Sequence, residues 1–533
     1  MKNVSKKPFR NCLIALSFII VNNSFSQPAI QMINHFGGNF QSDGRSIISD
    51  SEGNFIFCGN FNKSINFKDT TLNAFGDSAY GKNELVFGKM DPSGNVLWVH
   101  QIGGFFNHIN GVSNIEIDDL NNIYIYANNL YGSNLGDTIV GNQLILKYSK
   151  NGKRLFILQI FAGEIYDFHE KYNSIYLTGT NCKIKNGFDT IQISGNFILN
   201  LSNEGSYNWH TTTNKKNYKF EIAKDSSIYL YSKILLDSAS GIGSPTRLFF
   251  DKTDKFGNLK LSRYFDGSGF ANISDMFLNK ESLFLTGYYF GTLNFSESLI
   301  DGLADCFLVR LDTDINVKYA NRIINYNREA SNLKIKADNN NCYFVGNLSG
   351  FYSGTVLNES KGYNDNFVVK YDSIGNEAWH IQFGGTADFD PSDLVGDISI
   401  TPQGKLLFAG SFSGQITINN SIVTSTSFNY EDMLFLQFDI PTLINSNIEK
   451  NNIISVYPNP CISILNFSNS KYSFIKIFDE TGTLVLQTKK NEIDQNINME
   501  SFEDGIYIYE IISDHGQILQ VGKILHLKNN NFR

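Results

Sequence analysis

Three carboxylates stand close together in the second half of this chain, at Asp388, Asp390 and Asp393. Clustered carboxylates can bind Ca²⁺ or work as general acid and general base. Their spacing does not match an EF-hand loop, and neither does that of the acidic turns at 50–54 and 118–119. We therefore interpret all of them as solvated turn acids. The three aspartates are kept as ligand-binding candidates, with calcium as the one cofactor considered.

The eight histidines show no HxxxH or similar ligand spacing. His100, His210 and His380 follow a tryptophan by one or two positions, which indicates a repeated place on exposed strands. The sequence contains no glycine-rich phosphate loop, no nucleophile elbow and no zinc signature. It therefore predicts neither a catalytic residue nor a metal site.

A repeat explains where these residues stand. Short apolar runs end at a polar turn residue seven times, with gaps of 51 to 67 residues between them. The turn residues are Asp91, Ser149, Ser202, Thr253, Asp312, Asp372 and Asp439. Upstream of each run lies another hairpin pattern, so each unit has four strands, and such sheets bury both faces only by stacking. The period predicts an all-β fold with a seven-bladed β-propeller over residues 27–440.

The strand after each turn carries a large apolar residue in one register. Trp98, Trp209 and Trp379 are the three tryptophans of the chain, and all fall in this slot. An aromatic binding face is one interpretation, and packing between neighbouring blades is the one we favour.

The ends of the repeat indicate how the ring closes. The seventh unit meets Ile440-Pro441 where its fourth strand should begin. Residues 29–38 end in Phe36-Gly37-Gly38, which resembles the Ile102-Gly103-Gly104 ending of a fourth strand. We expect the N-terminal strand to complete the last blade and so to remove an exposed sheet edge.

The axis of the ring is where a propeller enzyme would place its site. A propeller enzyme would aim carboxylates or histidines from several blades at this axis. We expect turn and apolar residues there, with no repeated acidic position on the inner strands. This favours a non-catalytic binding module for an extracellular protein or glycan. The alternatives are a secreted hydrolase or lyase with a site in the central funnel, and a purely architectural spacer.

The net charge argues against one class of ligand, and the N-terminus predicts an exported protein. A net charge of −8 argues against nucleic-acid binding. Residues 1–26 combine a basic start, an apolar run and small residues, which is typical of a signal peptide cleaved after Ser26, and no later segment predicts a transmembrane helix. Of the six cysteines, Cys12 lies in the apolar run and would be lost with the signal peptide, and the other five are Cys58, Cys182, Cys306, Cys342 and Cys461. They are expected to be mostly small buried strand residues, with one incidental disulfide left open.

A different pattern follows a polar linker at 441–452. Tyr457-Pro458-Asn459-Pro460 comes first, then a D-x-x-G turn at Asp479 and Gly482, and then Phe502-x-x-Gly505-x-Tyr507. This order resembles the type A sorting domain of type IX secretion cargo in Bacteroidota, over about residues 453–528 of a domain at 453–533, with Phe502 in place of the usual leucine. The resemblance implies an Ig-like β-sandwich that the type IX translocon and sorting machinery recognise. It also implies removal after export, and then release or attachment to lipopolysaccharide at the cell surface.

Overall fold

The computed structural model describes part of the chain. The described residues are 28–75, 83–103, 112–128, 133–134, 139–140, 143–186, 189–236, 244–295, 298–323, 330–338, 341–348, 351–353, 357–359, 364–385, 393–418, 421–427, 430–440, 456–457, 461–467, 474–479, 483–489, 495–512 and 518–527. The expected signal peptide at 1–26 and the linker at 441–452 lie outside them. The chain divides into two compact units, Met1–Pro441 and Thr442–Arg533.

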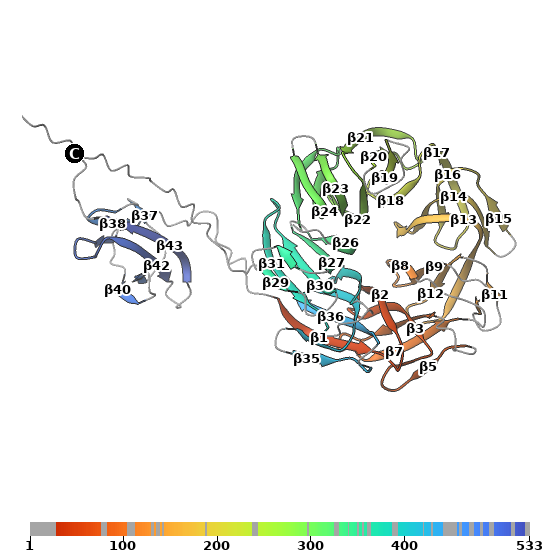
Figure 1. Cartoon of the computed structure of the whole chain (residues 1–533), viewed down its shortest axis with the longest axis horizontal. Coiled ribbons are helices and arrows are strands. Elements are labelled where there is room, and N and C mark those ends of the chain that lie inside the picture. The colour runs from red at the N-terminus through yellow and green to blue at the C-terminus, as the bar shows by residue number, and fades with distance from the viewer. Residues whose placement is uncertain are drawn as a thin grey trace, which may run out of the picture. The chain divides into compact units, whose positions relative to one another are not determined.

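The first unit is a seven-bladed β-propeller, which confirms the fold class predicted from the repeat (Figure 1). Each blade is an antiparallel sheet of four strands, and β13 serves two blades in turn. From the inner to the outer strand, blade 1 is β2 (Ser42–Ser49), β3 (Phe55–Asn62), β6 (Asn83–Met90) and β7 (Val96–Ile102); blade 2 is β8 (Val112–Ile117), β9 (Ile123–Asn128), β12 (Gln143–Tyr148) and the first half of β13 (Arg154–Lys171); blade 3 is the second half of β13, β14 (Ser174–Asn186), β16 (Asn196–Ser202) and β17 (Tyr207–Thr213); blade 4 is β18 (Asn217–Ile222), β19 (Ile228–Leu235), β20 (Thr246–Thr253) and β21 (Leu259–Gly267).

The remaining three blades complete the ring. Blade 5 is β22 (Ala271–Asn279), β23 (Ser282–Phe295), β24 (Ser298–Asp312) and β25 (Val317–Arg322); blade 6 is β26 (Ala330–Ala337), β27 (Cys342–Leu348), β30 (Asp365–Tyr371) and β31 (Glu377–Phe383); blade 7 is β32 (Val395–Ile400), β33 (Leu406–Phe412), β36 (Asp432–Asp439) and β1 (Ala29–Phe36). Small hairpins project between second and third strands: β4 (Ser64–Asn66) with β5 (Thr71–Asn73), β10 (Ser133–Asn134) with β11 (Ile139–Val140), β28 (Phe351–Ser353) with β29 (Leu357–Glu359), and β34 (Gln415–Ile418) with β35 (Ser421–Thr424), while β15 (Asp189–Gln192) pairs with the end of β14.

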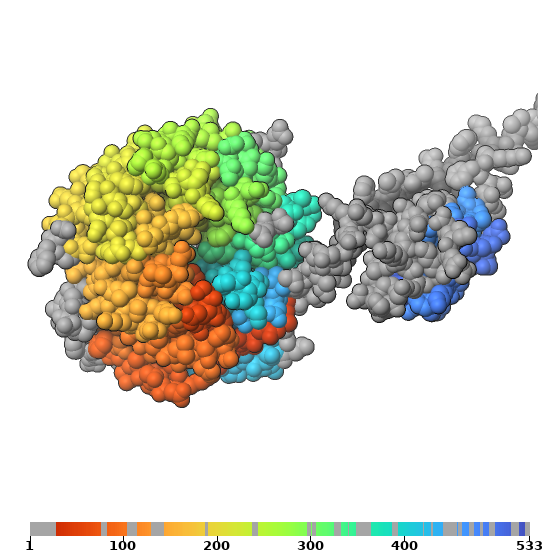
Figure 2. Space-filling model, turned by 180° about the vertical axis from the view of Figure 1, so that it is seen from behind, coloured from red at the N-terminus to blue at the C-terminus, as the bar shows by residue number. Residues whose placement is uncertain are grey.

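The first strand of the chain lies in the last blade. β1 pairs antiparallel with β36, from Ala29 opposite Asp439 to Phe36 opposite Met433. The space-filling view shows the red N-terminal segment lying against the cyan and blue strands of that blade (Figure 2). Segments from both ends of the propeller sequence therefore share one sheet.

Tight turns join the first strand to the second in each blade and the third strand to the fourth in blades 1 to 6, so these turns all lie on one face of the ring, called here the turn face. In blade 1, the Asp91 carboxylate accepts the Ser93 and Asn95 backbone N–H groups at 2.9 and 2.8 Å, and Gly94 takes a φ of +84°. In blade 4 the sequence pattern predicts Thr253 as the first residue of the turn, which is one residue too early. Thr253 ends β20, and Asp254 accepts the Asn258 N–H, because 254–258 carries the full D-x-x-G-N pattern.

These turns hold neighbouring blades together. Gly152 in the blade 2 turn lies against the Trp98 ring of blade 1, and its carbonyl accepts a hydrogen bond from His100 Nε2 at 2.8 Å. Lys89 of blade 1 donates to the Lys150 carbonyl in the same turn at 3.3 Å. Related contacts recur: Lys147 reaches the Asn203 carbonyl, Lys252 the Thr313 carbonyl and Arg310 the Ser373 carbonyl of the following blade. The tryptophan slot therefore packs between blades.

The Gly-Gly ending of the fourth strands has a steric cause. A Cβ atom on Gly384 would overlap the buried Asp365 carboxylate at the start of the third strand. Gly103 stands in the same relation to Glu84, and Gly37 to Asp432. Burial raises the pKa of Glu84 to about 7 against the hydrogen bonds it accepts from Phe75 and Gln101. The glycine thus leaves room for a buried carboxyl group in each of these blades.

Five of the six cysteines lie within described residues, and these five are free and buried: Cys58, Cys182, Cys306, Cys342 and Cys461. The expected role as small buried residues is confirmed, and the alternative of an incidental disulfide is wrong.

The second unit contains two antiparallel sheets. One is formed by β37 (Val456–Tyr457), β38 (Ile464–Phe467) and β41 (Gln495–Asn498), and the other by β40 (Leu484–Lys489), β39 (Phe474–Phe478), β42 (Gly505–Ile512) and β43 (Ile518–His526). Ile475, Ile477 and Ile511 of the second sheet share a buried core with Leu465 and Phe467 of the first. This arrangement is the expected Ig-like sandwich.

The overlap at Gly384 generates a stability prediction. We expect Gly384→Ala to lower the free energy of unfolding by about 1–3 kcal/mol, because the added methyl group meets the Asp365 carboxylate. The double variant with Asp365→Ser should lose less than the sum of the two single variants, because the shorter side chain opens the space. Urea denaturation of the four proteins measures this coupling, and strictly additive losses would contradict the steric explanation.

Candidate functional site

The innermost strands of the blades line a central channel, and each carries a β-bulge. The bulges fall between Gly44 and Ser46, Val112 and Asn114, Ile165 and Asp167, Asn217 and Lys219, Ile273 and Asp275, Ser331 and Lys334, and Val395 and Asp397. A bulge redirects the side chain that follows it. The residues after the bulges, Ser46, Asn114, Asp167, Lys219, Asp275, Lys334 and Asp397, all line one cavity. We call these seven residues the channel ring.

The side chain that follows each channel-ring residue packs into a hydrophobic cluster. These side chains are Ile47, Ile115, Phe168, Phe220, Met276, Ile335 and Ile398, all of them buried. The next position returns to the cavity and supplies Glu116, His169, Glu221 and Lys336. Alternation along a strand places every second residue on one side, so the inner strands of blades 2, 3, 4 and 6 each present two polar residues to the axis.

This arrangement corrects the expectation for the axis. We expected turn and apolar residues there, yet the cavity is lined by five carboxylates (Glu116, Asp167, Glu221, Asp275 and Asp397) and by Arg45, His169, Lys219, Lys334 and Lys336. The error arose because the inner strands are short and polar, while the strongly apolar second strands dominated the repeat. The missed signal is a polar–apolar–polar triplet before each second strand, such as 114–116, 167–169 and 334–336.

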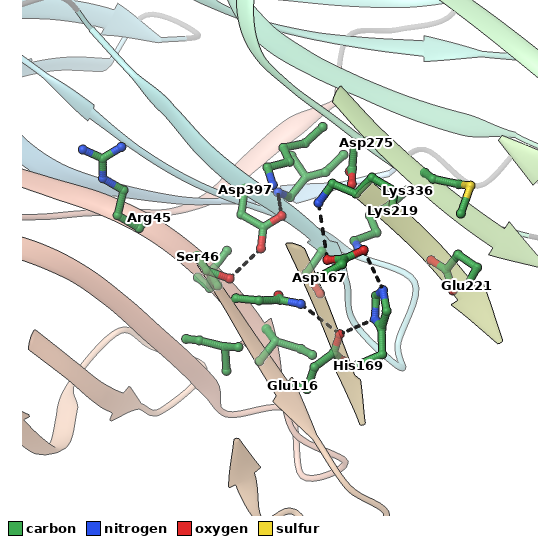
Figure 3. A pocket seen from close by; sticks show the side chains of 18 residues that line it. Arg45, Ser46, Glu116, Asp167, His169, Lys219, Glu221, Asp275, Lys336 and Asp397 are labelled. Carbon is green, nitrogen blue, oxygen red and sulfur yellow. Dashed lines mark hydrogen bonds and ion pairs between the residues drawn. The ribbon is translucent and has the colours of Figure 1, made fainter. Parts of the chain in front are cut away.

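One side of the channel is a chain of ion pairs (Figure 3). His169 Nδ1 lies 2.9 Å from Glu116 Oε1, and His169 Nε2 lies 3.6 Å from Asp167 Oδ2. The other Asp167 oxygen lies 3.4 Å from Lys219 Nζ. Two cations and two carboxylates from blades 2, 3 and 4 therefore neutralise one another, and we call these four residues the paired quartet.

The ion pairs within the quartet keep its side chains charged. Burial disfavours the His169 imidazolium, but hydrogen bonds to Asp167 and Glu116 outweigh it and raise the pKa of His169 to about 10. Burial also opposes ionisation of Asp167, yet Lys219 and His169 hold its pKa well below the usual range. All four groups are therefore charged at neutral pH.

Channel-ring side chains also connect adjacent blades. Asp167 of blade 3 accepts the Phe220 backbone N–H of blade 4 at 3.2 Å, and Asp275 of blade 5 accepts the Ile335 N–H of blade 6 at 3.0 Å. Ser46 of blade 1 donates to Asp397 of blade 7 at 2.6 Å. An inner strand has a free edge toward the axis, and these carboxylates satisfy part of it.

The space left between these side chains is small. The cavity has a volume of about 80 Å³, which corresponds to about six water molecules. Such a space admits a small molecule and is too small for a sugar ring.

The acidic candidates from the sequence lie elsewhere. Asp388 and Asp390 lie outside the described residues. Asp393 is 3% exposed, and its two oxygens accept the backbone N–H groups of Gly385 and of Ser413, the latter at 3.0 Å. Burial raises the pKa of Asp393 to about 7. In the structure Asp393 secures a connection between blades 6 and 7 and does not line the channel cavity.

The other candidates from the sequence also engage local partners. His380 Nδ1 lies 2.6 Å from Glu377, and His210 Nδ1 lies 3.0 Å from the Tyr207 hydroxyl. In the acidic turn at 50–54, Asp50 accepts hydrogen bonds from the Glu52 and Asn54 N–H groups and lies 2.7 Å from Lys89 Nζ. Throughout the described part of the chain, no three His, Cys, Asp or Glu side chains are placed to hold a metal ion.

Some of the sorting-motif residues lie within the described ranges of the second unit. Pro458, Asn459, Pro460 and Gly482 lie outside them, and Tyr457 pairs with Asn466 through β37 and β38. Asp479, Gly505 and Tyr507 line one hollow of about 500 Å³, together with Phe502. Two separate motifs therefore meet at one place in the second unit.

Contacts inside this hollow explain part of the motif. Asp479 Oδ1 accepts the Thr483 N–H at 2.9 Å, which forms the turn. The Tyr507 hydroxyl donates to the Glu503 carbonyl at 3.0 Å, and its ring meets Phe502 edge-on with centroids 5.3 Å apart.

The paired quartet generates a prediction about stability. We expect Asp167→Asn to lower the free energy of unfolding by about 2–3 kcal/mol at pH 7, because it leaves the half-buried His169 and Lys219 without their shared carboxylate. Glu221→Gln is the matched control, since Glu221 is 4% exposed and belongs to no ion pair in the described structure. Urea denaturation compares the two, and equal losses would contradict the role of the quartet.

Comparisons with known proteins bear first on the second unit. The family model described as "Secretion system C-terminal sorting domain" matches residues 455–525. Beta-agarase D of Zobellia galactanivorans is 36% identical over 67 residues, which are 13% of this chain and 14% of that protein. The chain thus spans about a seventh of the length of this curated relative.

Solved structures resemble the chain distantly. The Pan2 WD40 domain of Neurospora crassa is 10% identical with a TM-score of 0.32, covering 62% of this chain and 90% of that domain. A protein of unknown function from Bacteroides caccae is 8% identical with a TM-score of 0.31, covering 56% of this chain and 89% of that protein.

No helix within the described residues is long and apolar enough to cross a membrane. The sandwich fold, the convergence of Asp479, Gly505 and Tyr507, and the family match agree on the second unit. Residues 455–525 are a type A C-terminal sorting domain, and the chain is a β-propeller protein that the type IX secretion system exports to the cell surface or the extracellular space.

Proposed function

We propose that the exported propeller is a non-catalytic binding protein, and that it takes an extracellular glycan on its turn face at blades 3 and 4. The observation that carries this proposal is a group of exposed aromatic rings there. Phe256, in the turn between β20 and β21, is 53% exposed, and Tyr207, at the start of β17, is 50% exposed.

A half-buried tryptophan supports these rings. Trp209 meets Phe256 edge-on, with ring centroids 6.4 Å apart, and meets Tyr176 edge-on at the same distance. The Tyr207 hydroxyl is hydrogen-bonded to His210. Rings fixed in this way lose little conformational freedom on binding and offer both an apolar surface and a polar edge. The C–H face of a sugar and its hydroxyl groups require this combination.

The alternative function is a hydrolase or lyase at the central funnel. The convergence of carboxylates and His169 from several blades favours it, since this is how a propeller enzyme would build a site. Two observations weigh against it: the cavity of about 80 Å³ is too small for a sugar ring, and His169, Glu116 and Asp167 are occupied with one another. We therefore place the glycan on the turn face.

Binding can be tested with the full chain on a polysaccharide array. We expect Phe256→Ala to weaken binding to the recognised glycan by about 3- to 10-fold, because one stacking surface is lost. Ile374→Ala is the matched control, since Ile374 is an exposed apolar residue in the equivalent turn of blade 6. Binding that survives Phe256→Ala and fails with Ile374→Ala would contradict this location. Capture of a protein with no glycan bound, or turnover of a polysaccharide lost in Asp167→Asn, would contradict the proposed function.

Export offers a separate test. We expect a chain lacking residues 453–533 to accumulate in the periplasm, because the machinery no longer finds its sorting domain. Cell fractionation and surface protease digestion measure the distribution, and unchanged circular dichroism of the shortened protein serves as the control for folding. Normal appearance of this shortened chain at the surface would contradict the role of the domain. We also propose that the exported propeller is either released or attached to lipopolysaccharide after the domain is removed.

A further inference from the structure

The central cavity has two unlike sides. Glu116, Asp167, His169 and Lys219 pair with one another at 2.9–3.6 Å. Lys334 and Lys336 on blade 6, and Glu221 on blade 4, line the same cavity and take part in none of the ion pairs within 4.0 Å found among the described residues.

These groups remain oriented toward the axis. Lys334 follows the bulge of β26, and Lys336 is two residues further along the same strand, so both lie on the axial side. Lys336 Nζ also lies 5.1 Å from the centroid of the Phe277 ring. The close view labels Lys336 beside Lys219 and Asp275 at the cavity (Figure 3).

Charge persists on the lysine side. Burial disfavours the Lys336 ammonium, but the surrounding carboxylates, led by Asp397 and Asp275, hold the pKa of Lys336 well above its usual value. Burial raises the pKa of Glu221 above its ordinary value, against the attraction of His169 and Lys171. Asp275 and Asp397 also lie outside the ion pairs, but they accept hydrogen bonds from the Ile335 N–H and from Ser46. Lys334, Lys336 and Glu221 therefore gain most from an occupant that brings an opposite charge or a hydrogen-bond donor.

The size and the charge of the cavity restrict that occupant. Its volume of about 80 Å³ holds about six water-sized atoms. The lining is balanced, with five carboxylates facing five cationic side chains. An anion alone would neutralise Lys334 and Lys336 but leave the Glu221 carboxylate without a partner. A cation alone would pair with Glu221 and leave the two lysines without one. A molecule with a carboxylate at one end and an ammonium group at the other can pair with the lysines and with Glu221 at the same time.

We propose that the central cavity binds a small zwitterion of the size of glycine, alanine or serine. Its carboxylate lies at Lys334 and Lys336, and its ammonium group lies at Glu221. This site lies at the axis of the ring and is distinct from the proposed glycan surface at Phe256 and Trp209.

The experiment uses the full chain and titration calorimetry, with glycine, L-alanine and L-serine as probes. We expect saturable binding of at least one of them. Lys336→Gln and Glu221→Gln should each weaken this binding by about 10- to 100-fold, because each removes one charge-assisted contact. Lys280→Gln and Glu204→Gln are the matched controls on exposed positions and should leave it unchanged.

Two further probes test whether binding requires both charges of the zwitterion. Acetate and methylammonium each carry one of the two charges and should bind at least about 10-fold more weakly than glycine. Equal binding of acetate would overturn the proposal, and so would retention of binding in both channel variants or no binding of any of the three amino acids. If the variants fail to fold, saturation-transfer NMR of glycine on the unaltered protein decides, and no transfer would overturn the proposal.

Discussion

Most blades are joined to the preceding blade by a tight turn whose glycine packs against a residue on that blade's outer strand, and in blade 5 Ile315 takes the place of the glycine. Gly152 lies on Trp98, Gly375 on Tyr319 and Gly94 on Asn34, and each glycine carbonyl accepts a hydrogen bond from that outer strand. The contact is directional, because the turn of one blade always meets the strand of the preceding one. Repeated contacts of this kind produce a closed ring, since only closure leaves no blade without a partner.

The turn chemistry follows from this contact. A side chain on Gly152 would occupy the place of the Trp98 ring, and a φ of +80° is a conformation that glycine adopts without strain. The basic residue two positions before the turn, such as Lys89 or Lys147, extends to the carbonyl of the next turn. These features recur with the repeat because the same seam is built again between successive blades.

The outline of the fold could be predicted because each repeat contains apolar runs that end at recognisable turn residues. Seven units, four strands per unit and the sandwich near the C-terminus follow from periodicity and from motifs such as the Asp479 turn. One turn was placed a residue early at Thr253, because a hydroxyl residue and the true initiator, Asp254, stand side by side.

The candidate site could not be predicted in the same way. The side chains of the channel ring reach the axis only because a bulge precedes each of them, as between Ile165 and Asp167, and a bulge leaves little trace in a sequence. The pairing of His169 with Glu116 joins two blades, so no local pattern reveals it. Asp393 shows the opposite case: it is conspicuous in sequence, yet both its oxygens are taken by backbone N–H groups.

The pairing of β1 with β36 has a consequence for biosynthesis. These strands are about 400 residues apart along the chain, so the last blade forms only when the ribosome has passed Asp439. The sorting domain begins after that point, at residue 455. A product of premature termination before β36 therefore lacks both the strand that closes the ring and the domain that directs export. Incomplete rings are thus excluded from the cell surface by the order of the gene alone.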